Sequence, residues 1–177
     1  MNDSLSKQFL ALLDFPILSR IRRNHGLEHA TLNILKSRNI NVPMGGHSDM
    51  NGFWILGDID TAELHLAAAE ALQRLRAGER ELAVHPNCGT NFATAGVMAG
   101  TAAALSMLGA GERRRDKLER IPMAITLATL ALILAQPLGL RVQERITTSG
   151  DPGGMEILEI FARPSGKIKA HRVLTQG

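Results

Sequence analysis

Two stretches of about 20 residues without an ionisable side chain constrain this chain more than any other feature. They are FATAGVMAGTAAALSMLGAG, within 91–111, and IPMAITLATLALILAQPLGL, at 121–140. A helix of about 20 apolar residues is long enough to cross the hydrocarbon core of a bilayer. We therefore expect two transmembrane helices that form a hairpin around the basic turn ERRRDKLER.

The alternative is a buried helical hairpin inside a soluble protein. Two uncharged segments of this length would use up the core of a 177-residue chain, which favours the membrane. Gly96 and Gly100 form a small-xxx-small step on the first helix, which suits close approach of the second helix or of another copy. Besides the lipid bilayer, we therefore expect a homo-oligomer or a larger membrane complex.

The residues that flank the hairpin predict a folded α+β domain. Within 1–90, the pattern predicts a helix over 24–37, two short strands broken at Gly45-Gly46 and Asn51-Gly52, a helix capped by Thr61, and a strand in ELAVHPN. Within 142–177 it predicts a β-hairpin turned at Pro164-Ser165-Gly166, with Glu156 and Glu159 facing lysines. An isolated hairpin of this length is marginal, so we expect it to complete the sheet of the first part. The predicted fold is an α+β soluble domain with a transmembrane hairpin inserted at 91–141.

The opening segment MNDSLSKQFLALLDFPILSRIRR leaves two readings open. Apolar residues flanked by arginines suit a helix that lies along a membrane surface, and an ordinary core helix explains them equally well. The segment lacks the cleavage site of a signal peptide. Because export of the whole 1–90 segment is harder than export of a short loop, we expect the polar part on the cytoplasmic side of a two-span membrane protein.

The helix RRNHGLEHATLNILKSRN carries chemistry near its start. His25 and His29 lie one helical turn apart, and Glu28 stands beside them. Two imidazoles can hold one zinc ion, and a nearby carboxylate can accept a proton from a metal-bound water. The H-x-x-E-H pattern resembles that of the inverzincin metallopeptidases, which implies zinc ligands at His25 and His29 and a general base at Glu28.

Further ligands have two sources in the sequence. Glu63 and Glu70 lie on the next predicted helix, where the inverzincin pattern places a third ligand. HPNCGTN offers a sharper alternative, because His85 and Cys88 flank a Pro-Asn turn and suit a soft divalent ion. A closed set of His25, His29, His85 and Cys88 would be a structural site, whereas three of them and a water would be catalytic.

The other histidines carry weaker predictions. His47 lies in a glycine-rich loop that can reach the site, although a solvated side chain explains it more simply. His65 and His171 are expected on the surface. A reading without metal also remains, in which His25 and His29 bond to backbone carbonyls or acids and HPNCGTN is a turn.

Three blocks together, HGLEHATLNIL, GGHSDMNGFWILGDI and ELAVHPNCGTN, precede the two apolar segments. This arrangement resembles an uncharacterised family of small bacterial and cyanobacterial membrane proteins, a domain of unknown function, from about Arg22 to Leu140. The resemblance implies a membrane location and a single unit built from the three blocks. It implies no activity.

Two functions follow from these patterns. The first is a membrane-tethered zinc hydrolase that cleaves peptides, with Glu28 as base and His25, His29 and either His85 or Cys88 around the metal. The second is a non-enzymatic membrane assembly subunit, in which the same residues form a structural metal site or a hydrogen-bonded core. We expect no nucleic-acid partner, because the net charge is only +3 and the basic residues are spread over helix ends and membrane flanks.

Overall fold

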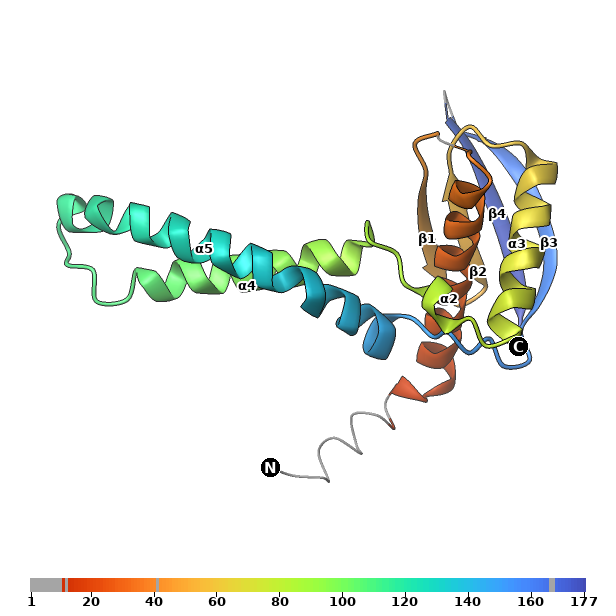
Figure 1. Ribbon diagram of the computed structural model, residues 1–177, viewed down its shortest axis with the longest axis horizontal. Helices are drawn as coiled ribbons and strands as arrows, with labels where there is room; N and C mark the ends of the chain where they lie inside the picture. Colours follow the sequence, from red (N-terminus) through yellow and green to blue (C-terminus); the bar gives the residue numbers. More distant parts are fainter. Residues whose placement is uncertain (1–10, 12, 41, 166–167) are drawn as a thin grey trace. The chain divides into compact units, whose positions relative to one another are not determined.

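The computed structural model describes residues 11, 13–40, 42–165 and 168–177 of the chain (Figure 1). It divides into two compact units. Unit 1 combines Met1–His85 with Glu144–Gly177, and unit 2 is Pro86–Gln143. The mixture of helices with one antiparallel sheet confirms the α+β prediction.

A four-stranded antiparallel sheet in the order β1-β2-β4-β3 forms the base of unit 1. Its strands are β1 (Gly45–Asp49), β2 (Gly52–Leu56), β3 (Glu156–Ser165) and β4 (Ile168–Gln176). β4 pairs with β2, and Phe53 lies opposite Val173. A strand from the end of the chain therefore lies inside the sheet, so unit 1 cannot close until the chain has returned from unit 2.

Helices α2 (Pro16–Ser37) and α3 (Thr61–Arg76) cover one face of this sheet (Figure 1). The buried core joins Leu27 of α2 and Leu64 of α3 to Phe53 and Val173 of the strands. Burial of one such side chain contributes about 1.5–3 kcal/mol. α2 starts earlier than the predicted 24–37 because Pro16 occupies its first turn, where a missing N–H and a fixed φ cost nothing.

Two local predictions in unit 1 are wrong. Asp60, not Thr61, caps α3, because its carboxylate accepts hydrogen bonds from the backbone N–H groups of Ala62 (2.8 Å) and Glu63 (3.3 Å). The segment predicted as a strand in ELAVHPN contains a 3-10 helix, η1 (Arg80–Ala83). Asn33 Nδ2 donates to the carbonyls of Leu82 and Val84, which occupies acceptors that a strand would present to a sheet.

The strands also differ in detail from the prediction. Asn51-Gly52 does mark the β1–β2 turn, but Gly45 and Gly46 lie within β1. The predicted pairing of glutamates with lysines is wrong, because Glu156 lies opposite Gln176 and Glu159 opposite Leu174. A register shift between Ile157 and Glu159 separates these two pairs. Gly166 of the predicted turn lies outside the described residues.

Unit 2 consists of two antiparallel helices, α4 (Gly89–Ser106) and α5 (Arg114–Val142). α5 begins within the basic segment that was predicted as a turn, so 107–113 alone connects the helices. Asn91 packs against Gly139, and its Oδ1 accepts a hydrogen bond from Gln143 Nε2 at 2.6 Å. A Cβ added at Gly96 or Gly100 would meet no heavy atom within 4 Å, so this small-residue step is not the contact with α5.

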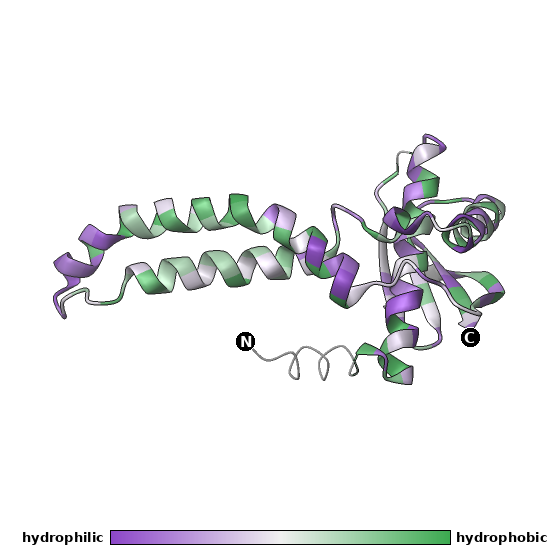
Figure 2. Cartoon of the chain, turned by 60° about the horizontal axis from the view of Figure 1, so that its bottom comes forward, coloured by the Kyte–Doolittle hydropathy of each residue, from purple (hydrophilic) through white to green (hydrophobic). Residues whose placement is uncertain are grey.

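One helical stretch among the described residues, Arg114–Thr147, is long and apolar enough to cross a membrane by its length and composition. It includes α5 and the π-helix η2 (Gln143–Thr147). Figure 2 shows the green of hydrophobic residues along most of α5 and the purple of hydrophilic residues at its ends. α4 does not meet the same criterion, because Thr, Asn and Gly residues dilute its apolar side chains. The two-span hairpin therefore stays a prediction.

Candidate metal centre

Helix α2 places the three residues of the H-x-x-E-H pattern on one side, as its periodicity requires. The ring centroids of His25 and His29 lie 4.3 Å apart, with the rings edge to face. Glu28 and His29 are buried, with 4% and 2% of their surface exposed. Ionisable side chains that are this deeply buried need hydrogen-bond partners, and both Glu28 and His29 have them.

Each histidine of the pair bonds to a main-chain carbonyl through Nδ1. His25 Nδ1 lies 2.9 Å from the carbonyl oxygen of Thr147, and His29 Nδ1 lies 2.8 Å from that of Ala83. A carbonyl oxygen can only accept, so Nδ1 carries the proton in both rings and Nε2 of the neutral ring carries the lone pair. Histidines that bind metals are held in this way. The carbonyl contacts of the metal-free reading are thus present, and they are compatible with a metal.

Gly26 allows the chain segment that contains Thr147 and Ser149 to come close to α2. A Cβ on Gly26 would lie 2.1 Å from the carbonyl oxygen of Ser149. The backbone N–H of Ser149 donates to Arg22 O at 2.9 Å, and Arg22 Nη2 donates to Thr148 O at 3.2 Å. The segment after η2 is therefore bound to α2 through Arg22, three residues before His25.

His85 lies next to His29, with 5.7 Å between the ring centroids. Burial, together with the nearby His29 and Lys36, lowers the pKa of His85 to about 4. The imidazole is therefore neutral at pH 7, which is the form that binds metals. His85 belongs to unit 1, as do His25 and His29.

Cys88 follows His85 by three residues and caps helix α4. Its Sγ accepts a hydrogen bond from the backbone N–H of Thr90 at 3.4 Å. A helix N-terminus stabilises the thiolate, which is the form that binds metals. Cys88 belongs to unit 2, so it joins His25 and His29 of unit 1 as a third ligand in the proposal below, on the ground of its chemistry.

Glu28 faces strand β1. Its Oε2 accepts a hydrogen bond from Ser48 Oγ. A Cβ on Gly46 would lie 2.2 Å from Glu28 Oε1, so only glycine leaves room for the carboxylate at this position. No sequence pattern predicted that Ser48 and Gly46 would be neighbours of Glu28.

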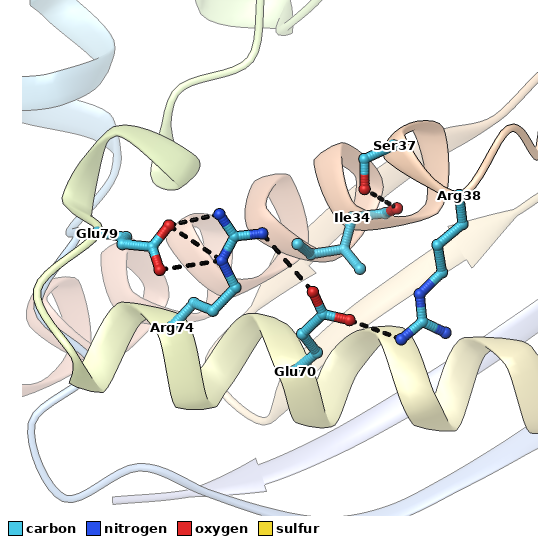
Figure 3. Close-up of polar contacts among 6 residues, drawn as sticks. All are labelled: Ile34, Ser37, Arg38, Glu70, Arg74 and Glu79. Atoms are coloured by element: carbon cyan, nitrogen blue, oxygen red, sulfur yellow. Dashed lines mark hydrogen bonds and ion pairs between the residues drawn. The ribbon is translucent and has the colours of Figure 1, made fainter.

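The alternative acidic ligands are engaged elsewhere. Arg38 pairs with Glu70 (2.6 Å) and with Glu63 (3.3 Å), and Figure 3 shows Glu70 between Arg38 and Arg74. These ion pairs join the end of α2 to α3. Neither glutamate belongs to the metal-ligand group found among the described residues.

The remaining histidines lie apart from this group. His47 is exposed on β1, opposite Trp54, and His65 is exposed on α3. The surface prediction for His171 is wrong, because this side chain is fully buried in the central strand β4. Its Nε2 lies 3.1 Å from Thr61 Oγ1, and burial lowers its pKa.

A pocket of about 710 Å³ lies against the main-chain segments that hold the two histidines. Its lining includes Ala83, whose carbonyl binds His29, and Thr148, which follows the residue that binds His25. Charged side chains of both signs complete it: Arg22, Arg80, Glu81, Glu144 and Asp151. A substitution or ligand that moves the main chain of this pocket would also move the carbonyls that bind His25 and His29.

Comparisons with known proteins place this chain in a family. Residues 20–160 match a family model described as a domain of unknown function, DUF6391. The chain belongs to this family. The match confirms the resemblance noted from the sequence blocks, and it covers the H-x-x-E-H helix, η1, both helices of unit 2 and part of β3.

A relative of this DUF6391 chain is an uncharacterised protein of Picosynechococcus sp.. The two are 34% identical over 164 residues, which is 82% of this chain and 76% of the relative. No solved structure matches the chain. The family and this relative therefore supply no activity, and the chemistry has to be argued from the residues.

Proposed function

We propose that this DUF6391 chain is a membrane protein that binds a zinc ion through His25, His29 and Cys88. The observation that carries the proposal is the pair of Nδ1 bonds to main-chain carbonyls, which fixes the tautomer and the orientation of His25 and His29 as in histidines that bind metals. Cys88, at a helix N-terminus, is the thiolate that we propose as the third ligand. Two imidazoles and a thiolate are a donor set typical of zinc. His85, beside His29, is the fourth ligand of a closed structural site or a neighbour of an open catalytic one.

The membrane part of the proposal rests on α5 and its exposed apolar side chains. Ile125, Leu130, Ile133 and Leu134 are each at least half exposed, with fractions of 62%, 51%, 59% and 65%. Such a surface is unfavourable in water and suits contact with lipid. We propose that α4 crosses beside α5, with the polar unit 1 on the cytoplasmic side, and that the step at Gly96 and Gly100 meets another copy.

Hydrolysis is the chemistry that we propose for an open site, with a peptide as the substrate class. A bound zinc ion supplies Lewis acidity, which lowers the pKa of a coordinated water and polarises a carbonyl. Glu28 is the proton acceptor that we propose, because it is a buried carboxylate one helical turn after His25; it would have to turn from strand β1 toward the metal. Ser48 orients that carboxylate by donating to Oε2.

A structural site is the second candidate. The crowding of His85 against His29 favours it, because a closed shell of four N and S ligands is typical of structural zinc. The protein would then be an assembly subunit in which the metal stabilises unit 1. The two candidates differ in what Glu28 does.

Metal content tests the shared part of the proposal. Elemental analysis of the detergent-purified chain should find about one zinc per chain. The His25→Ala/His29→Ala variant should lose it, and the His65→Ala variant, at an exposed histidine on α3, should keep it. Cobalt(II) gives a second readout, because a thiolate ligand adds a charge-transfer band that Cys88→Ser should remove. Metal-free, folded wild type after zinc addition would refute the metal site.

Glu28→Gln separates hydrolase from structural subunit. The amide keeps the size of the side chain and can still accept from Ser48, so folding and zinc content should stay close to wild type. A zinc hydrolase would lose peptide cleavage by at least about 100-fold, because the proton acceptor is gone. Cleavage that survives in Glu28→Gln would rule out the role of Glu28 as base.

A further inference from the structure

The start of α2 exposes a group of apolar side chains that the metal site does not use. Phe15, Ile17 and Leu18 are exposed to 56%, 45% and 37%. Met50, in the β1–β2 turn, is exposed to 41% and lines the same pocket as Ile17. We name these four residues the α2 entry face. Their exposure favours the membrane-surface interpretation of residues 15–18, and residues 1–10 and 12 of the opening segment lie outside the described residues.

Two arginines border the α2 entry face. Arg20 and Arg23 line the pocket of about 420 Å³ that also contains Ile17 and Met50. Arg20 donates from Nε to Gly177 O at 3.1 Å, and Arg23 donates from Nε to Ser19 O at 3.4 Å. These bonds hold each guanidinium through Nε, and the Nη groups carry further N–H donors suited to a phosphate. The lining contains one carboxylate side chain, Asp14.

We propose that the α2 entry face docks unit 1 on an anionic phospholipid bilayer. The four apolar side chains would enter the boundary between headgroups and acyl chains, and Arg20 and Arg23 would bind lipid phosphates. Apolar residues beside cations at a helix start form the pattern of an interfacial helix. The inference rests on the membrane location proposed above, which is supported by Arg114–Thr147, a helical stretch long and apolar enough to cross a membrane by its length and composition.

A protein partner fits this surface less well. Stable protein interfaces use about 20–30 residues on each side. The α2 entry face offers four apolar residues and two cations, which suffices for interfacial insertion of one helix end in a chain that is already anchored. The inference uses no metal ligand, so it stands or falls independently of the zinc site.

Fluorescence quenching by brominated lipid tests the docking directly. The single Trp54 is replaced by Phe, which keeps an aromatic ring under Arg172, and a new tryptophan is introduced by Phe15→Trp. The full-length protein is reconstituted in bilayers of phosphatidylcholine and phosphatidylglycerol with brominated acyl chains. Leu66→Trp, at a residue of α3 that is exposed to 57%, is the matched control.

The proposal expects strong quenching of the Phe15→Trp reporter and little quenching of the Leu66→Trp reporter. Equal quenching of the two reporters would overturn it. If Trp54→Phe fails to fold, both reporters are compared in the wild-type background after subtraction of the Trp54 signal, with the same two outcomes.

Charge variants test the lipid class. Arg20→Gln and Arg23→Gln should each lower the ratio of docked to undocked Phe15→Trp reporter by about fivefold in bilayers with phosphatidylglycerol. In pure phosphatidylcholine the same variants should have little effect. Quenching of Phe15→Trp that is independent of both the arginines and the anionic lipid would refute the phosphate contacts.

Discussion

Substitution of Gly26 by alanine is the sharpest test of how the histidines are held. The new Cβ would lie 2.1 Å from the carbonyl oxygen of Ser149 and 3.0 Å from its carbonyl carbon. A normal carbon–oxygen contact needs about 3.3 Å, so the segment after η2 must move away from α2 by about 1 Å. That movement breaks the 2.9 Å bond from His25 Nδ1 to Thr147 O and the 2.9 Å bond from Ser149 N to Arg22 O.

The magnitude follows from these two bonds and the charged bond of Arg22 to Thr148 O. Loss of the two neutral bonds costs about 1 kcal/mol each, and the charged bond costs about 1.5–3 kcal/mol. Alanine returns about 1 kcal/mol of helix propensity. We expect the free energy of unfolding of unit 1 to fall by about 2.5–4 kcal/mol. Zinc affinity should fall about 10–100-fold, because His25 loses the carbonyl that orients it.

Competition with a zinc chelator measures the affinity, and Trp54 fluorescence in denaturant reports unfolding of unit 1. Gly100→Ala is the matched control, because it is also a helical glycine and its Cβ would meet nothing within 4 Å. That variant should bind zinc like wild type. If Gly26→Ala behaved like Gly100→Ala in both assays, the link between the Ser149 approach and the metal site would be refuted.

Three further predictions use other contacts. Gly46→Ala should destabilise unit 1 by about 1–3 kcal/mol in thermal or chemical unfolding, because its Cβ would meet Glu28 Oε1 at 2.2 Å, whereas Gly45→Ala should be neutral. Gly139→Ala should separate α4 from α5 at Asn91, where the Cβ would lie 2.7 Å from Oδ1, and hydrogen exchange of the first turns of α4 should rise about tenfold or more. Metal-free unit 1 should lose stability as the pH falls from 6.5 to about 4, because the lowered pKa of His85 lets the unfolded chain bind the proton more tightly. Because the side chain is only half buried, solvent screens the effect, and His85 contributes about 1–2 kcal/mol to that loss of stability. A His85→Gln variant should flatten the dependence of stability on pH.

The sequence predicted the parts of unit 1 that depend on periodicity. The 3.6-residue period placed His25, Glu28 and His29 together, and two runs of alternating residues gave the C-terminal hairpin. It also grouped Cys88 with the histidines, which stays a prediction because Cys88 lies in unit 2. These features are local, so a single sequence contains the information for them.

The contacts that orient the site could not be predicted in the same way. His25 and His29 bond to carbonyls of Thr147 and Ala83, and a carbonyl is present at every residue, so no side-chain pattern marks the two that are used. ELAVHPN was read as a strand because Asn33, which binds its carbonyls, lies far away in sequence. Glycines next to the motif were the available sign, since Gly26 and Gly46 both leave space for a close approach.

The two residues whose carbonyls bind the histidines both lie next to a boundary of unit 1. Ala83 lies just before the chain leaves unit 1 at His85, and Thr147 lies just after the chain returns at Glu144. One helix, α2, therefore binds the outgoing segment through His29 and the returning segment through His25. Because β4 must come back to pair with β2, unit 1 closes only when both segments are in place. A metal that holds His25 and His29 would thus stabilise the closure of unit 1, whether the site is structural or catalytic.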